Sequence, residues 1–240
     1  MSSDKIYNIY QKLYAAYGPQ GWWPFINYKG VNSSKEGNSE GYHIGEYSFP
    51  RSDLECFEVC LGSILTQNTT FTSVVKSLHN LKALNALSPK AIKKLDSDTL
   101  KQAIRPSGYH NQKARYLLAF IDFYEALEGR TPTRDELLAV LGIGEETADS
   151  ILLYGYNQLE FKVDAYTKRI LLQLGLIDEK AKYKDVKKLM QESLYNSITD
   201  DKTLLIIYQE FHALIVNHAK RYYSKKPYAE GCFLSTEFRS

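Results

Sequence analysis

The 240-residue sequence is poor in the features on which several classes of protein depend. It contains only 3 cysteines, which are too few for the disulfide framework of a small secreted domain. It has no run of 18 apolar residues that could span a membrane, and its first residues lack the pattern of a signal peptide. We therefore expect an intracellular protein.

Charge of one sign is also lacking, because 30 basic residues face 28 acidic ones. A net charge of +2 does not by itself predict a nucleic-acid partner, since a phosphate-binding surface needs a local excess of positive charge. Local excess does occur, at residues 113–115, 168–169 and 220–226. The overall charge therefore leaves the function open.

Signals for β-strands are almost absent, whereas apolar residues recur at the three- and four-residue spacing of helices. The clearest helical stretches are residues 4–17, 52–65, 112–127, 183–198 and 201–223. A chain of this length can form one large domain or two lobes with separate cores. We therefore expect an all-α fold.

The most informative stretch runs from Leu138 to Leu174. It contains two helical segments that are separated by the turn Gly142-Ile143-Gly144-Glu145. Both glycines are expected to supply the positive φ angles of this turn. The second helix then begins with unpaired N–H groups, which together with the helix dipole favour an anion such as phosphate. A hairpin of this kind positions a nucleic-acid backbone without reading its sequence.

The segment LGIGEETADSIL resembles the helix-hairpin-helix of the endonuclease III superfamily of DNA glycosylases. The segment FKVDAYTKRIL resembles the part of that family that carries its catalytic aspartate, here Asp164. In the family the aspartate follows the hairpin at a short fixed distance, and Asp164 lies 22 residues after Gly142. The resemblance assigns the grip on the DNA backbone to Gly142, Gly144, Glu145 and Thr147.

The same resemblance implies two helical lobes with the active site in a cleft between them. The central lobe, with the helix-hairpin-helix, comprises residues 50–158. The second lobe is built from both chain ends, residues 1–49 and 159–240. Residues 29–50 have no counterpart in the relatives, and their Gly, Ser and Asn content predicts an exposed insertion, either a mobile loop or a two-stranded flap.

Two further segments resemble the loops with which the family probes DNA. ILTQNTTF resembles the segment whose glutamine fills the space left by an extruded base, which assigns this role to Gln67. RPSGYHNQKA resembles the second probing loop, with Tyr109 as the wedge residue and Lys113 near the phosphates. The simpler alternative for this second segment is a proline-glycine corner without a functional role.

The loop Trp22-Trp23-Pro24 either plugs the core or offers flat aromatic faces on which a base can stack. Trp-Trp-Pro and T-Q-N-T occur together in a branch of the family that includes 3-methyladenine DNA glycosylase III. The match to that branch adds Phe71 to the walls of a base pocket and places Lys220 near its mouth. The helix dipole explains a basic residue late in a helix equally well.

A glycosylase extrudes the target nucleotide, and a carboxylate then stabilises the positive charge that develops on the deoxyribose. Asp164 is the candidate, and because its sequence context is also typical of a helix N-cap we expect both roles at once. Bifunctional members of the family carry a lysine 18 residues before the aspartate, where this chain has Glu146. A carboxylate cannot form a Schiff base, so we expect base excision without β-elimination.

The C-terminal tail resembles the place where many members bind an iron–sulfur cluster, which requires four cysteines. Only Cys232 occurs there, so we expect no cluster. Cys56 and Cys60 stand four residues apart on an apolar helical pattern, a spacing that allows a metal but indicates core packing more simply. A monovalent cation at the hairpin is the one ion that we consider.

The sequence and the family resemblance therefore predict a monofunctional, monomeric DNA glycosylase of base-excision repair that acts on double-stranded DNA. We expect it in the cytoplasm or nucleoid, or in the nucleus if the organism is a eukaryote. Aromatic walls suit an electron-poor alkylated purine such as 3-methyladenine, since cation–π attraction contributes about 0.5–2 kcal/mol. An abasic-site endonuclease would process the product. Two alternatives remain: a monofunctional glycosylase for uracil, mismatched thymine or an oxidised base, and a non-catalytic helix-hairpin-helix DNA-binding protein.

Overall fold

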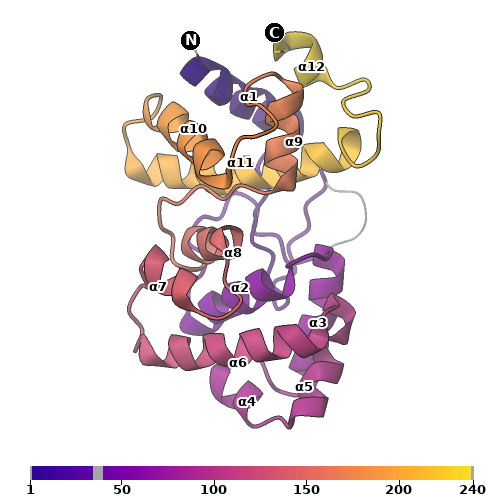
Figure 1. Cartoon of the computed structure of the whole chain (residues 1–240), viewed down its shortest axis with the longest axis vertical. Coiled ribbons are helices and arrows are strands. Elements are labelled where there is room, and N and C mark those ends of the chain that lie inside the picture. The colour runs from indigo at the N-terminus through magenta and orange to yellow at the C-terminus, as the bar shows by residue number, and fades with distance from the viewer. Residues whose placement is uncertain (1, 35–39, 239–240) are drawn as a thin grey trace. The chain divides into compact units, whose positions relative to one another are not determined.

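The computed structural model describes residues 2–34 and 40–238. The regular elements of this part of the chain are helices, and its one pairing of extended backbone is an antiparallel bridge between Val31 and Glu40. The predicted all-α fold is confirmed (Figure 1). Within the same residues, none of the helices has both the length and the apolar character needed to cross a membrane.

The chain forms two compact units. Unit 1 comprises Met1–Pro24, Gly30–Tyr47 and Gln158–Ser240, and unit 2 comprises Phe25–Lys29 and Ser48–Asn157. The sequence placed residues 25–29 and 48–49 with the chain ends, but the structure assigns them to unit 2. The reason is hydrogen bonding to the rest of unit 2: the N–H of Ile26 donates to Glu58 at 2.8 Å, and Asn157 Nδ2 donates to the carbonyl of Phe49 at 3.3 Å.

Unit 2 is built around α2, in which every residue from Cys56 to Leu65 is buried. A surface helix would be amphipathic, so this continuous burial marks α2 as the centre of the core. The helices of unit 2 are α2 (Asp53–Leu65), α3 (Phe71–Ala83), α4 (Pro89–Lys93), α5 (Ser97–Ile104), η1 (Arg105–Ser107), α6 (His110–Ala126), α7 (Arg134–Ala139), α8 (Glu145–Ser150) and η2 (Ile151–Gly155). Most begin at a side-chain cap, for example Ser52 before α2 and Thr70 before α3.

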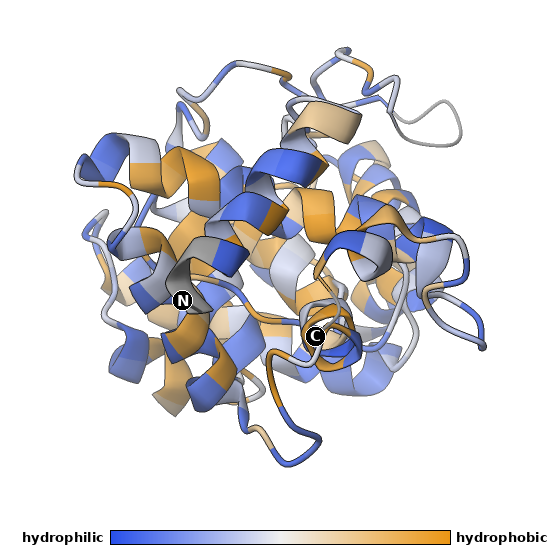
Figure 2. Ribbon diagram, turned by 90° about the horizontal axis from the view of Figure 1, so that it is seen from above, coloured by the Kyte–Doolittle hydropathy of each residue, from blue (hydrophilic) through white to orange (hydrophobic). Residues whose placement is uncertain are grey.

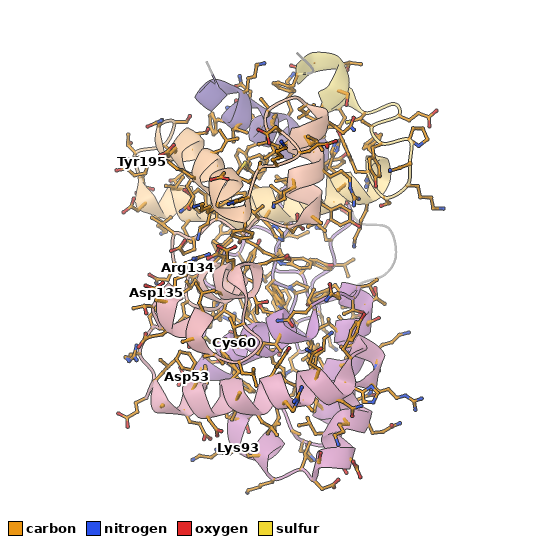
Figure 3. All side chains as sticks on the ribbon, in the orientation of Figure 1. Asp53, Cys60, Lys93, Arg134, Asp135 and Tyr195 are labelled. Carbon is orange, nitrogen blue, oxygen red and sulfur yellow. The ribbon has the colours of Figure 1, made fainter. Side chains whose placement is uncertain are left out.

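Both cysteines of α2 lie inside this core, and Figure 3 labels Cys60 there. Their sulfur atoms face Gly155 of η2, where a Cβ would lie 3.7 Å from each of them. Among the residues that the structure describes, no three His, Cys, Asp or Glu side chains gather as a metal site requires. The spacing of Cys56 and Cys60 therefore reflects close packing of α2 against η2.

Unit 1 holds both chain ends and is organised around the long helix α11. Its helices are α1 (Ser2–Tyr17), α9 (Ala165–Gln173), α10 (Tyr183–Tyr195), α11 (Asp201–Tyr222) and α12 (Phe233–Phe238). Helix α1 packs on α10, α11 and α12, and α9 packs on α11. Apolar and hydrophilic residues alternate along these helices, which is the amphipathic pattern that lets each bury one face (Figure 2).

The end of the chain is fixed to α11 by a buried histidine. His218 bonds Tyr17 through Nδ1 at 2.9 Å and Cys232 Sγ through Nε2 at 3.2 Å. Burial lowers the pKa of His218 to about 4, so the ring is neutral at neutral pH. This histidine is therefore a packed residue of the core of unit 1.

A buried carboxylate connects residues 25–29 to α2. Glu58 Oε1 accepts a hydrogen bond of 2.8 Å from the backbone N–H of Ile26, two residues after Pro24. Burial raises the pKa of Glu58 to about 7, and the hydrogen bond from Ile26 offsets only part of this rise. Because the folded pKa lies above the ordinary value of 4.5, the stabilisation from protonated Glu58 is complete below about pH 4.5 and is lost as the pH rises through about 7.

We therefore expect Glu58→Gln to remove a pH-dependent loss of stability. Glutamine keeps an oxygen acceptor for Ile26 but carries no charge. When the pH is raised from about 5 to about 8, the free energy of unfolding of the variant should increase by about 1–3 kcal/mol relative to that of the wild type. Urea denaturation at the two pH values measures this difference, and an equal effect of the substitution at both would contradict it.

Candidate functional site

The helix-hairpin-helix consists of α7 and α8. Helix α7 begins with a capping box between Thr133 and Glu136, which fixes its start. At the turn, Gly142 has a φ of 84°, and a Cβ on this residue would overlap the ring of Tyr116 on α6. Backbone conformation and close packing therefore both require glycine at position 142.

The second glycine of the turn has a different role from the one predicted. Gly144 has a φ of −97°, an extended conformation open to other residues, and a Cβ there would meet no atom within 4 Å. Gly144 is the N-cap of α8 and provides no side chain to cap the helix. The N-cap residue therefore offers no side-chain acceptor to the first N–H groups of α8, and a helix start of this kind suits an anion.

Acidic residues surround the start of α8. Arg134 Nε donates to Asp149 Oδ1 at 2.8 Å, and its guanidinium also lies 3.5 Å from Glu145. Figure 3 labels Arg134 on α7 beside α8, so this cation joins the two helices. Glu145 and Glu146 are both exposed. Their charges interact favourably with the helix dipole and compete with any incoming anion, so backbone N–H groups must supply most of the grip.

The side chain of Gln67 is bound to the hairpin. Its Nε2 donates to the carbonyl of Gly142 at 2.9 Å and to Thr147 Oγ1 at 3.0 Å. The predicted gap-filling residue and the predicted phosphate grip are thus in direct contact, and Thr147 is buried. Gln67 must exchange these two hydrogen bonds for others before its amide can enter a duplex.

The loop before α6 places one predicted residue outside and one inside. Tyr109 is 65% exposed and adopts a left-handed conformation with a φ of 46°. Lys113 is only 2% exposed, and its Nζ donates at 2.7 Å to the carbonyls of Leu65 and Ser107. The exposure of Tyr109 fits a wedge residue. The burial of Lys113 revises its predicted place near the phosphates, because its charge is directed into unit 2.

Asp164 is the N-cap of α9, as predicted. Its Oδ1 accepts from the backbone N–H of Thr167 at 2.7 Å and from the Thr167 hydroxyl at 2.9 Å. Both bonds fall on one oxygen, and within the described residues Oδ2 accepts no hydrogen bond. The side chain is half-buried. The cap therefore fixes the carboxylate and leaves its second oxygen available to a substrate.

Asp164 is held in its charged form. Burial raises its pKa, but the nearby charges of His212 and Lys162 and the two hydrogen bonds from Thr167 outweigh burial and place the pKa below its ordinary value. The carboxylate is therefore anionic at neutral pH. Such a group can stabilise a developing positive charge, and it cannot act as a general acid there.

The loop Trp22-Trp23-Pro24 is covered by the insertion, which the sequence predicted to be exposed. Trp23 is only 2% exposed, and its carbonyl lies 3.0 Å from Nε2 of the buried His43. Tyr42 is also buried and lies 6.2 Å, between ring centroids, from the half-buried Trp22. The Val31–Glu40 bridge is the closest match to the predicted flap, whereas residues 35–39 lie outside the described part. The insertion thus supports the aromatic loop.

The remaining predicted residues have simpler surroundings. Phe71 begins α3 and packs, partly buried, against the core of unit 2. Lys220 is exposed on the last turn of α11, where a cation interacts favourably with the dipole. The predicted residues of unit 1 are Trp22, Trp23, Pro24, Asp164 and Lys220, and those of unit 2 are Gln67, Phe71, Tyr109, Lys113 and the hairpin.

Comparison with known proteins identifies the family. Residues 61–195 match the model of the HhH-GPD superfamily of base excision DNA repair proteins. The chain belongs to this superfamily. The matched segment contains the hairpin, Gln67 and Asp164, whereas Trp22, Trp23, Pro24 and Lys220 lie outside it.

Two relatives extend the similarity beyond that segment. A candidate DNA repair glycosylase of Methanocaldococcus jannaschii is 36% identical over 95% of this chain and 93% of its own. Endonuclease III of Sulfolobus acidocaldarius is 30% identical over 81% of this chain and 89% of its own. With the superfamily match, these similarities make the chain a DNA glycosylase of base-excision repair.

Solved structures confirm the fold. The H. pylori 3-methyladenine DNA glycosylase, bound to 1,N6-ethenoadenine, is 28% identical with a TM-score of 0.61 over 71% of this chain and 89% of its own. An endonuclease III in a non-covalent complex with DNA is 17% identical with a TM-score of 0.67 over 95% of this chain and 89% of its own. At that lower identity the similarity shows the fold alone.

The two glycines of the HhH-GPD hairpin should respond differently to substitution. In Gly142→Ala the alanine must adopt a positive φ and its Cβ must displace the ring of Tyr116. This substitution should destabilise the protein by about 2–4 kcal/mol. Gly144→Ala, the matched control, has an ordinary φ and free space, and should cost less than about 1 kcal/mol. Chemical denaturation measures both. Equal losses for the two variants would contradict this account of the turn.

Proposed function

We propose that the chain is a monofunctional glycosylase that releases an alkylated purine, such as 3-methyladenine, from double-stranded DNA. The observation that carries the proposal is the state of Asp164, an anionic carboxylate whose Oδ1 caps α9 and whose Oδ2 is available to a substrate. Alkylation already weakens the bond between the base and the deoxyribose, so one oriented anion that stabilises the positive charge on the sugar is sufficient for the base to leave.

The reaction begins with an extruded nucleotide, because the glycosidic bond is inaccessible in stacked DNA. The bond between C1′ and the base nitrogen breaks, and the base departs with both bonding electrons. The deoxyribose becomes an oxocarbenium cation, which the Asp164 carboxylate stabilises. Water then adds to C1′ and loses a proton, which leaves an abasic site for a downstream abasic-site endonuclease.

DNA is held and opened by groups of unit 2 in this proposal. The N–H groups at the start of α8 bind a backbone phosphate, with a monovalent cation at the turn as a further candidate. Gln67 leaves Gly142 and Thr147 to fill the space of the extruded nucleotide, and the exposed Tyr109 enters from its own loop. None of these groups reads a base sequence, which suits a repair enzyme.

The choice of substrate rests on aromatic side chains. Trp22 is half-buried and offers a ring, while the buried Trp23 supports the loop and does not itself stack on a base. The rings of Trp22 in unit 1 and of Phe71 in unit 2 each offer a face that would attract a positively charged alkylated purine by about 0.5–2 kcal/mol. The 28% identity to a 3-methyladenine glycosylase supports this substrate class.

Two absences distinguish this chain from other members of the superfamily in our proposal. Glu146 stands where the family resemblance implies the Schiff-base lysine of bifunctional members, and a carboxylate cannot form an imine. The C-terminal tail does not fit an iron–sulfur cluster, because Cys232 is its single cysteine. The sulfur of Cys232 instead bonds Nε2 of His218 and lies 3.5 Å from the hydroxyl of Tyr223.

The substrate is tested with duplexes that each carry one lesion, followed by identification of the released base. We expect release of 3-methyladenine and little release of uracil, of thymine from a mismatch or of an oxidised purine. Asp164→Asn keeps a capping side chain but removes the anion, and should lower the release rate by at least about 10²-fold with DNA binding retained.

Release of uracil without 3-methyladenine would refute the substrate but not the enzyme class. Binding without release of any base, unchanged by Asp164→Asn, would instead support a non-catalytic DNA-binding protein.

The absence of lyase chemistry is tested by borohydride reduction during turnover. A Schiff base would be trapped as a covalent protein–DNA adduct, as in an endonuclease III for which a trapped covalent intermediate is known and which serves as the positive control. We expect no adduct with this chain and an intact strand until the abasic site is cleaved by alkali. A trapped adduct would show that an amine other than residue 146 attacks the sugar.

A further inference from the structure

Lys113 is a buried cation that the function described above does not use. It lies in the first turn of α6 with 2% of its surface exposed. Its Nζ donates two hydrogen bonds of 2.7 Å, one to the carbonyl of Leu65 and one to the carbonyl of Ser107. Burial lowers its pKa to about 8, so the ammonium remains largely charged at neutral pH.

The two carbonyls belong to the ends of two different helices. Leu65 is the last residue of α2, and Ser107 is the last residue of η1. Carbonyls at helix ends lack partners within the helix, and a cation there also interacts favourably with the dipole of α2. Lys113 therefore caps the C-terminal end of α2 and at the same time joins α2 to η1, the short helix that precedes α6.

The positions of these carbonyls in the chain give the contact its meaning. Leu65 precedes Gln67 by two residues, and Ser107 precedes Tyr109 by two residues. One ammonium group thus fixes the starting points of both loops that the proposed function uses to open DNA. The Ser107 side chain is held as well, by a hydrogen bond of 2.8 Å to Ser77 on α3.

The arrangement is costly for a purely structural contact. Within the described residues no carboxylate pairs with Lys113, so two carbonyl dipoles alone compensate its charge. Burying a charge without a counter-ion is unfavourable, and an apolar side chain of similar length would fill the same space without that cost. A methionine would pack there but would bind neither carbonyl.

We propose that Lys113 is a positioning residue that holds the Gln67 loop and the Tyr109 loop in the register needed to enter a DNA duplex together. This inference rests on the proposed roles of Gln67 and Tyr109. It does not depend on which base is excised. Lys113 contacts neither DNA nor the reacting atoms in this account and acts through the backbone of the two loops.

The test uses a duplex with a tetrahydrofuran abasic-site analogue next to 2-aminopurine, whose fluorescence rises when its stacking is disturbed. The wild type should raise the fluorescence at saturating protein. Lys113→Met should lose most of this rise, while its affinity for undamaged duplex stays within about threefold, because the hairpin is intact. A base-release assay should show kcat reduced by about 10–100-fold with little change in KM.

Two controls separate positioning from loss of stability. Lys187→Met removes another buried lysine, which pairs with Glu160 in unit 1, and should lower stability without changing the 2-aminopurine response. Lys113→Gln keeps a polar side chain that is too short to join both carbonyls, and should show the same loss as Lys113→Met. All variants are compared at one temperature, at which urea denaturation has shown that each is fully folded.

A double variant decides whether Lys113 acts through the loops. Gln67→Ala already removes one of the side chains that enter the duplex. If the two residues share a role, Lys113→Met should reduce the 2-aminopurine response much less in the Gln67→Ala background than in the wild type, so that the two effects are not additive. Full additivity, or a normal 2-aminopurine response in folded Lys113→Met, would overturn the inference. A wild type that responds to the abasic duplex but releases no alkylated purine would refute the substrate proposal and leave Lys113 testable.

Discussion

Backbone groups at helix ends, which find no partner within their own helix, determine where the chemistry of this protein lies. At the start of α9, Asp164 Oδ1 accepts hydrogen bonds from the N–H and the hydroxyl of Thr167. These two bonds fix the carboxylate and leave its second oxygen available. Lys113 satisfies the last carbonyl of α2. At α8 the N-cap is Gly144, which offers no capping side chain, and our proposal places a phosphate at this helix start. In the proposed function, the same rule of backbone pairing supplies the catalytic anion, the joint between the two loops and the phosphate site.

The aromatic loop is held in place by residues that are distant from it in the sequence. Residues 30–47 belong to unit 1, and the buried ring of His43 lies between the carbonyls of Trp23 and Glu46. Glu210 of α11 accepts a bond of 2.6 Å from the backbone N–H of Gln20 and one of 3.2 Å from the hydroxyl of Tyr47. The start of the loop is therefore supported from the insertion and from α11, which leaves Trp22 as the more accessible ring.

Local patterns were sufficient where short-range physics decides the structure. Helical periodicity predicted the all-α fold, and residue spacing identified the hairpin and the N-cap at Asp164. The pattern misled where two residues of the same type have different backbone conformations. Gly142 needs its positive φ and the space beside Tyr116, whereas Gly144 is extended. Composition also misled for the insertion, because Asn32, Tyr42 and His43 are buried by partners that are distant in the sequence.

The sequence by itself determined the class of the protein, because the hairpin, the aspartate and their separation are local features that a linear motif records. Only the tertiary structure decided the roles of individual polar side chains. The sequence predicted Lys113 to be a phosphate ligand, yet its side chain is buried. The two carbonyls that it binds belong to Leu65 and Ser107, which precede it by 48 and 6 residues. Glu58 and Gln67 likewise acquire their partners by folding. The physical reason is that burial and hydrogen-bond partners depend on contacts between distant segments, which no local pattern contains.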